Sequence, residues 1–295
     1  MPAEGLDPAL GARDFDAERR AIHDLWESAA AGWARRREAW GEQSGPVADW
    51  LVEAIDPAPG LRVLDLAAGL GEVGFRALPR ILPGGALICS DQAPAMIDRA
   101  REHARELALD ERAIEFRELN GEWIDLEVAS VDRVLCRWGY MLMADPAAAL
   151  RETRRVLRSG GRVALAVWDA REHNPWSAVP GQVLLEHGLG EPFDPRAPGP
   201  FALHDVERLR GMLEEAGFAE IAIDDVEIVR SAPSFAEWWA IQLDLSVGTR
   251  TALAGAGEEQ ARAVEAEVAA RFAPYTGADG RLAVPGRTHV AVAEA

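Results

Sequence analysis

Between Leu61 and Trp168, short apolar runs alternate with longer amphipathic segments. The runs have the length of β-strands, and the segments between them have the length and periodicity of helices. Regular alternation of this kind is typical of a parallel sheet whose crossover helices cover both faces. We therefore predict a doubly wound α/β sheet, in which the carboxyl ends of the strands meet along one crevice.

Five strands are expected in this region: Arg62–Leu66, Ala86–Ser90, Ile114–Glu118, Val131–Cys136 and Arg162–Trp168. Three helices are expected between them: Gly71–Leu82, Pro94–Leu107 and Pro146–Leu157. Proline suits the first helical turn, so Pro94 and Pro146 mark two helix starts. The Gly160-Gly161 pair is expected to end the third helix. A helix over Asp205–Ala216, a strand over Ile221–Val229 and an antiparallel terminal strand over Thr288–Ala293 follow, which completes a mostly parallel sheet of seven strands.

The flanks predict a cover for this sheet. Residues 1–60 are expected to form a helical lid, and residues 61–295 the α/β domain, with cap insertions at about 169–203 and 231–285. The proline-rich first insertion is expected to be an irregular connection. The second is expected to be helical over Phe235–Arg271, with a break near Gly255–Gly257 and with Phe235, Trp238 and Trp239 facing an acceptor pocket.

Trp26, Trp33 and Trp40 recur every seven residues, so they project from one side of the N-terminal helix. Two interpretations remain open. The stripe either packs the helix onto the sheet or forms the aromatic wall of a lid over a substrate. The tryptophan-rich flanks could equally serve the interface of a homodimer.

The net charge of −18 disfavours a nucleic-acid partner, since a phosphate backbone is repelled by an acidic protein. The basic run Arg35-Arg36-Arg37 is followed by Glu38 and is expected to be a solvated helix face. No apolar stretch is long enough for a membrane span, and Met1–Arg13 does not resemble an export signal. Cys89 and Cys136 lie in apolar runs, as buried thiols of a cytoplasmic protein would. All basic residues are arginine, which suggests a GC-rich bacterial source.

The segment from Val63 to Gly74 turns from a strand into a helix through small residues. Gly69 and Gly71 allow a sharp turn and a close approach of the backbone to a ligand. The glycine spacing Gly69-x-Gly71-x-x-Gly74 also matches a dinucleotide-binding fingerprint. However, Asp65 precedes Gly69 by four residues, and a carboxylate there suits an ammonium group better than a pyrophosphate.

Asp91 ends the second expected strand, 20 residues beyond Gly71. A carboxylate in this place can accept hydrogen bonds from both hydroxyls of a ribose. The alternative is a helix cap before Pro94. The strand end, the spacing and the glycine loop together favour ribose binding.

Three segments together resemble the class I S-adenosylmethionine-dependent methyltransferases: Asp65-x-x-x-Gly69-x-Gly71, Asp91–Ile97 and Leu157–Arg162. Within this family the sequence is most similar to the group that contains the ubiquinone/menaquinone-biosynthesis methyltransferases and many natural-product methyltransferases. The likeness covers residues 47–170 and leaves out the flanks. It implies S-adenosylmethionine as cofactor, a Rossmann-like fold, and methyl transfer to O, C or N of a hydrophobic small molecule, quinone-like or from secondary metabolism.

The resemblance also assigns cofactor contacts. Asp65, Ala67 and Gly69 would hold the methionine part and Asp91 the ribose. The other implied residues are Gly71 in the turn, Gln92 and Met96 along the adenine, Asn120, Gly121 and Glu122 near its amine, and Arg137 at the methyl-transfer end. Asn120 departs from the family pattern, which has an acidic residue there, and its amide oxygen accepts a hydrogen bond more weakly than a carboxylate.

A general base is needed only if the acceptor is protonated at the working pH. His173, just past the fifth expected strand, is the best-placed candidate, and a surface histidine is the alternative interpretation. His23 and Tyr140 are weaker candidates, and Trp138 and Tyr140 are more typical of pocket walls. Asp145 and Asp169 lie near the crevice but lack the spacing of a metal site, so no metal is expected.

Two functions of other classes remain as alternatives. One is an NAD-dependent oxidoreductase, which rests on the glycine spacing alone. The other is a protein that binds S-adenosylmethionine without transferring methyl and guides a cyclisation with the positive charge of the cofactor.

Overall fold

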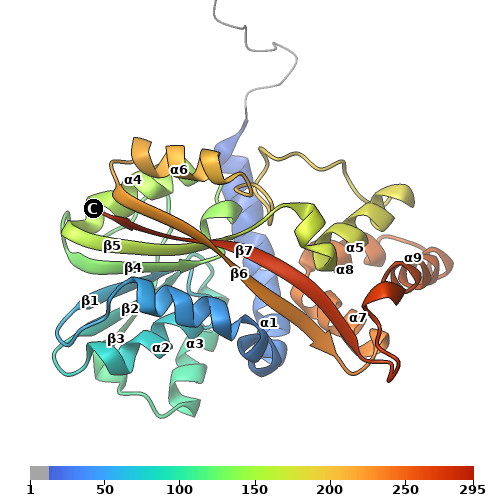
Figure 1. The fold of residues 1–295 in the computed structure, drawn as a ribbon, viewed down its shortest axis with the longest axis horizontal. Coiled ribbons are helices and arrows are strands. Elements are labelled where there is room, and N and C mark those ends of the chain that lie inside the picture. Colours follow the sequence, from blue (N-terminus) through green and yellow to red (C-terminus); the bar gives the residue numbers. More distant parts are fainter. Residues whose placement is uncertain (1–12) are drawn as a thin grey trace, which may run out of the picture.

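A computed structural model describes residues 13–295, so the first twelve residues of the expected lid, and nearly all of Met1–Arg13, lie outside the described residues. The chain forms one seven-stranded sheet in the order β3-β2-β1-β4-β5-β7-β6 (Figure 1). The strands are β1 Arg62–Leu66, β2 Ala86–Asp91, β3 Ile114–Glu118, β4 Val131–Arg137, β5 Leu157–Trp168, β6 Ala219–Ala232 and β7 Leu282–Glu294. Only β7 runs antiparallel to its neighbours, which confirms the predicted fold class.

Helices cover both faces of the sheet. Figure 1 shows α2 and α3 on one side and α4 and α6 on the other. The helices are α1 Phe15–Ala54, α2 Glu72–Ile81, α3 Pro94–Glu106, α4 Pro146–Val156, α5 Pro175–Glu186, α6 Val206–Glu215, α7 Phe235–Leu245, α8 Val247–Ala254 and α9 Glu258–Arg271. Asp145 caps α4 by accepting a hydrogen bond from the N–H of Ala148, and proline occupies the first turn of α3 and α4 as expected. No helix within residues 13–295 is long and apolar enough to cross a bilayer.

The Gly160-Gly161 pair does not end a helix, contrary to the prediction. Helix α4 ends at Val156, and the chain enters β5 at once, with Leu157 paired to Val131 of β4. The register shifts between Val131 and Arg133, and Gly160 has a φ of +73° within the strand. A side chain on Gly161 would lie 2.9 Å from the carbonyl oxygen of Asp132, so the glycines serve a bulge between two strands.

The two insertions differ from the prediction in opposite ways, since the first is more regular and the second has an additional break. The expected irregular connection contains α5, which begins at Pro175. Proline is tolerated at the first position of a helix, because the backbone N–H at that position has no partner within the helix. The helical region from Phe235 has the expected break, since α8 ends at Ala254 and α9 begins at Glu258, and it has a further break at Ser246. Ser246 is extended there, ends α7 and caps α8 through a hydrogen bond from the N–H of Thr249.

Strands β6 and β7 are much longer than expected and extend past β4 and β5 toward α7 and α9 (Figure 1). They support a second hydrophobic cluster, separate from the main core around the sheet. This cluster joins α5, α7, α9 and β7 through residues such as Val183, Trp238, Val268, Phe272 and Val284. Because Trp238 and Phe272 are packed here, the second insertion has a core of its own.

Helix α1 lies between the sheet and the group formed by α5, α7, α8 and α9 (Figure 1). It contacts α2, α3, α7 and β6, and the indole N–H of Trp33 donates to the carbonyl of Leu245 at 3.2 Å. Arg36 pairs with both Asp244 and Glu237 of α7 at 2.7 Å. The basic run is therefore not simply a solvated face, because it fastens α1 to the second insertion.

Close packing of α1 on α7 depends on Gly32. A Cβ at this position would lie 2.2 Å from the carbonyl oxygen of Asp244. We expect Gly32→Ala to lower the free energy of unfolding by about 1–3 kcal/mol, the usual cost of overpacking, although alanine favours helix. Gly211→Ala in α6 is the matched control, since a Cβ there meets nothing within 4 Å, and it should raise stability by about 0.5–1 kcal/mol. Urea unfolding of both variants measures the difference, and equal effects would contradict this account of the α1–α7 contact.

Candidate functional site

A cavity of about 480 Å³ lies at the carboxyl ends of β1, β2, β4 and β5. Its walls come from two parts of the chain. The loops after these strands form one end, and α1, α5, β6 and the α7–α8 junction form the other. Parallel strands place their carboxyl ends at one edge of a sheet, which is why residues distant in sequence meet here.

The loop after β1 is held by Asp65. Its Oδ2 accepts a hydrogen bond from the N–H of Gly74 at 2.7 Å, and a Cβ on Gly74 would lie 2.8 Å from the same oxygen. The side chain is almost fully buried and lines the cavity. Burial raises the pKa of Asp65 to about 7, against the lowering effect of the Gly74 hydrogen bond. Asp65 is thus a carboxylate whose charge lacks full compensation in this structure.

Ala67 and Gly69 line the cavity within this loop, whereas Gly71 does not. Gly69 has a φ of +55°, and a Cβ there would meet nothing within 4 Å, so the space beside it is open. Gly71 has a φ of +80°, and a Cβ would lie 2.4 Å from the ring of Phe75. Gly69 therefore leaves room for a ligand, and Gly71 allows the turn into α2.

Two residues other than glycine have left-handed backbone conformations at this edge. Ala67 after β1 has a φ of 54°, and Trp138 after β4 has a φ of 60°. Such a conformation is strained for a bulky residue and is kept only where the surroundings impose it. For Trp138 they do so through a stacked contact with Trp168, at 4.4 Å between centroids, and a hydrogen bond from the indole to Thr288 at 2.9 Å.

Asp91 at the end of β2 lines the same cavity. Its two oxygens accept hydrogen bonds from the N–H groups of Gly69 and Ala93, both at 3.0 Å. Each oxygen keeps acceptor capacity for a further donor. Burial raises the pKa of Asp91, and the two backbone hydrogen bonds oppose that rise. Gln92 and the buried Met96 line the cavity next to Asp91.

Asn120, Gly121 and Glu122 also line the cavity, after β3. The side-chain oxygen of Asn120 accepts from the N–H of Glu122 at 2.8 Å, which closes the turn. Glu122 itself is occupied, because it accepts from Arg19 of α1 at 2.7 Å and from the N–H of Ala144 at 2.9 Å. This carboxylate fastens α1 to the loops around the cavity.

Arg137 at the end of β4 lines the cavity and pairs with Glu72 in the first turn of α2. Its other Nη donates to the hydroxyl of Ser44 in α1 at 2.8 Å. Glu72 was not among the residues predicted from sequence, although its place directly after the glycine loop was a usable signal. The loop end of the cavity therefore holds four carboxylates and two arginines. Glu72 and Glu122 are paired with Arg137 and Arg19, whereas Asp65 and Asp91 have no arginine partner.

Tryptophans form a continuous chain along the other end of the cavity. The predicted stripe Trp26, Trp33 and Trp40 makes edge contacts at 5.7 and 6.0 Å between centroids. Trp40 then contacts Trp138 at 5.5 Å, and the chain continues through Trp168 to Trp176. All six line the cavity, whereas Phe235, Trp238 and Trp239 do not. The stripe both packs α1 onto the sheet and forms a cavity wall, so the two interpretations are compatible.

The candidate bases do not lie against this cavity. The hydroxyl of Tyr140 is fully buried and bonds to Thr153 at 2.6 Å, and burial raises its pKa well above the usual value. His23 points away from the cavity on α1, next to Asp24. His173 is 41% exposed and lies 2.7 Å from Asp169.

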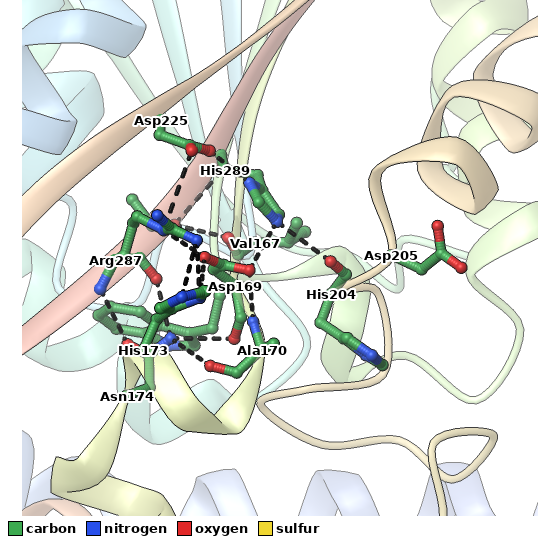
Figure 2. A network of polar contacts seen from close by, with 12 residues as sticks. Val167, Asp169, Ala170, His173, Asn174, His204, Asp205, Asp225, Arg287 and His289 are labelled. Atoms are coloured by element: carbon green, nitrogen blue, oxygen red, sulfur yellow. Dashed lines mark hydrogen bonds and ion pairs between the residues drawn. The ribbon is translucent and has the colours of Figure 1, made fainter.

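His173 belongs to a polar network outside the cavity. Figure 2 shows His173, Arg287 and His289 converging on Asp169, which directly follows β5. His289 also contacts Asp225 of β6 at 2.6 Å. Burial favours a higher pKa for Asp169, but the Ala170 N–H, Arg287 and His289 together hold it below its usual value. The network joins β5, β6 and β7, and we assign it to the sheet rather than to a reaction.

Among residues 13–295, no group of three or more His, Cys, Asp or Glu side chains could hold a metal ion. Asp145 caps α4, and Asp169 belongs to the network of Figure 2.

Known proteins resemble this chain in sequence and in fold. The model of a methyltransferase domain family matches residues 57–197. The YcgJ protein of Bacillus subtilis has the same fold, with a TM-score of 0.53 and 19% identity, covering 84% of this chain and 97% of that one.

Two relatives differ in how much of their length is matched. An uncharacterised Mycobacterium tuberculosis protein is 32% identical over 127 residues, and the match spans 43% of this chain but only 44% of that protein. The ubiquinone/menaquinone biosynthesis C-methyltransferase UbiE of Acidiphilium cryptum is 32% identical over 184 residues, which are 58% of this chain and 72% of UbiE. By this relationship and by its matching domain, the chain belongs to the class I S-adenosylmethionine-dependent methyltransferases.

Proposed function

We propose that the protein transfers a methyl group from S-adenosylmethionine to O, N or C of a hydrophobic small molecule. The observation that carries this proposal is the contrast between the two ends of one cavity. Carboxylates surround a glycine loop at one end, and tryptophans form the walls of the other. Carboxylates suit a cofactor with a sulfonium and an ammonium group, and they repel the diphosphate of a dinucleotide.

The residues present fit this cofactor. The open space beside Gly69 and the buried carboxylate of Asp65 suit the methionine part, with Ala67 presenting its backbone and Gly71 shaping the turn. The spare acceptor capacity of Asp91 suits the two ribose hydroxyls. Gln92, Met96, Asn120 and Gly121 would border the adenine. Since Glu122 is bound to Arg19 and Ala144, we assign it to holding this loop in place.

When bound, the cofactor supplies a methyl group on a positively charged sulfur. The protein must hold the acceptor nucleophile in line with that group and exclude water. We assign these tasks to Trp138, whose constrained backbone places it between the two ends of the cavity, and to Arg137, which holds Glu72 beside it. No histidine of the described chain lines the cavity, so we propose an acceptor whose nucleophile needs no histidine base.

We further propose that α1 and the insertion at 231–285 act as the acceptor cover. Both contribute to the apolar end of the cavity, through the tryptophan stripe and through Leu245 and Val247. Ion pairs between Arg36 and α7 hold the two parts together. Water-excluding covers over strand ends are the usual way in which such sheets protect a reaction from solvent.

The function is tested by ligand binding followed by product mass. We expect S-adenosylhomocysteine at a hundred times its Kd to raise the melting temperature, through about 2.7 kcal/mol of added stability, and NAD to have no effect. Stabilisation by NAD alone would overturn the proposal. With a panel of aromatic acceptors, a gain of one methylene in product mass supports methyl transfer. An isomerised product of unchanged mass would instead identify the cyclase function.

The role of Asp91 is tested by Asp91→Ala. We expect this variant to weaken S-adenosylhomocysteine binding by roughly 1.5–3 kcal/mol, because two charge-assisted hydrogen bonds are lost. Asp98→Ala is the matched control, since Asp98 is an exposed residue of α3 a few positions further on. Isothermal calorimetry measures both variants, and binding of Asp91→Ala at wild-type strength would remove Asp91 from the cofactor site.

The open space at Gly69 is tested by a pair of variants with matched backbone strain. Gly69 and Gly60 both have positive φ, and a Cβ at either position would meet nothing within 4 Å. Valine at either position costs stability because of its φ. We expect only Gly69→Val to abolish S-adenosylhomocysteine binding, since its side chain would fill the cofactor space. Equal calorimetric affinities of the two folded variants would contradict the placement of the cofactor.

A further inference from the structure

Arg230 of β6 lines the apolar end of the cavity and is only 3% exposed. It is not among the site residues predicted from sequence. Two other arginines that line the cavity have carboxylate partners, since Arg19 pairs with Glu122 and Arg137 with Glu72. Among the described residues, no carboxylate lies within 4.0 Å of the Arg230 guanidinium.

The surroundings of Arg230 are aromatic. Its guanidinium lies 5.2 Å from the ring centroid of Trp40, 4.6 Å from Trp176 and 5.8 Å from Trp238. Its one side-chain hydrogen bond goes from Nη1 to Oε1 of the buried Gln242, at a long 3.3 Å. Burial lowers the pKa of Arg230 to about 9, and no neighbouring carboxylate opposes that effect. Cation–π contacts compensate for only part of the hydration free energy that a guanidinium loses on burial.

Unused donors gather around this residue. The indole N–H group of Trp40, which lines the cavity, is buried and has no hydrogen-bond partner. An arginine side chain has five N–H donors, of which one is used here by another side chain. Buried polar groups in native proteins are normally satisfied, so several unsatisfied donors in one place indicate a missing acceptor.

We propose that Arg230 binds a carboxylate of the methyl acceptor, so that the acceptor is a hydrophobic organic acid. This inference rests on the proposed function and names its substrate class. The guanidinium has one positive charge and a planar fork that matches a carboxylate with two parallel hydrogen bonds. The single positive charge of Arg230 would neutralise only one of the two charges of a phosphate dianion, and burying the other charge among apolar side chains is costly. A carboxylate, with one charge, therefore fits better.

The position of Arg230 also orients the acceptor. Trp40 contacts both Arg230 and Trp138, and Trp138 borders the cofactor end. An acid held by Arg230 would lie along the tryptophan wall, with its carboxylate away from the glycine loop and the rest of its skeleton toward the cofactor. The carboxylates of the loop repel the acid group from the opposite end and so disfavour reversed binding.

A matched pair of probes tests the proposal by calorimetry, on protein saturated with S-adenosylhomocysteine. The probes are 1-naphthoate and the neutral 1-naphthamide, which have the same aromatic body. We expect wild-type protein to bind the naphthoate at least about tenfold more tightly than the amide, as loss of one charge-assisted interaction implies. Arg230→Met should abolish this preference and leave the affinity for the amide and for S-adenosylhomocysteine unchanged. Arg230→Lys should retain part of the preference.

Arg250→Met is the control variant, because Arg250 lies on the nearby α8, donates to the carbonyl of Leu243 and does not line the cavity. It should keep the full preference for the naphthoate. Without ligand, Arg230→Met should melt no lower than the wild type, since it removes a buried charge that has no partner. A lower melting temperature would mark Arg230 as structural and overturn the proposal.

Equal affinities of the wild type for the two probes, or no binding of either, would overturn the proposal too. So would a preference for the naphthoate that survives in Arg230→Met. These results are distinct from failure of the proposed function, which would appear as absence of S-adenosylhomocysteine binding before either probe is added.

Discussion

The hydrogen bond between the buried Asp65 carboxylate and the N–H of Gly74 determines how the cavity is built. It joins the end of β1 to the first turn of α2, and it is possible only because residue 74 has no side chain. With these two points fixed, the chain between them must turn within a few residues, which explains the left-handed conformations of Ala67, Gly69 and Gly71. Burial keeps this carboxylate in an environment that disfavours its charge, which is the property on which its proposed role in cofactor binding rests.

The cavity has opposite electrostatic character at its two ends. Asp65, Glu72 and Asp91 make the loop end acidic, whereas Arg230 is the one unpaired charge at the tryptophan end within the described chain. In a low-dielectric space such charges act over longer distances than in water. The electrostatic potential of the cavity therefore favours one orientation of a molecule that carries a negative group at one end and a positive group at the other. Shape alone, in an aromatic cavity of this kind, would discriminate less sharply between related molecules.

Residues 61–168 could be predicted closely from sequence, because hydrophobic periodicity, helix-start prolines and glycine turns are local signals. The first three strands begin at the predicted residues, and the cavity lining includes Asp65, Gly69 and Asp91. The errors arose where tertiary contacts decide. The bulge at Gly160 depends on β4, α5 forms despite its prolines, and the direction of His173 is set by Asp169 and Arg287. Arg230 gave no signal, since a single arginine at a strand end is ordinarily solvated.

The two ends of the cavity are built from different parts of the chain, which has a consequence for how its specificity can change. Residues 57–197 match the domain model and include Trp138, Trp168 and Trp176. The rest of the tryptophan end, formed by α1, the end of β6 and the α7–α8 junction, lies outside that match. The second insertion packs in a hydrophobic cluster around Trp238 and Phe272, together with α5 and β7, and this cluster is separate from the main core. Substitutions there can alter one end of the cavity while Asp65, Gly69 and Gly74 stay unchanged. If these segments cover the acceptor as proposed, this arrangement would let the specificity of the protein change by substitution in the cover while the loop after β1 is retained.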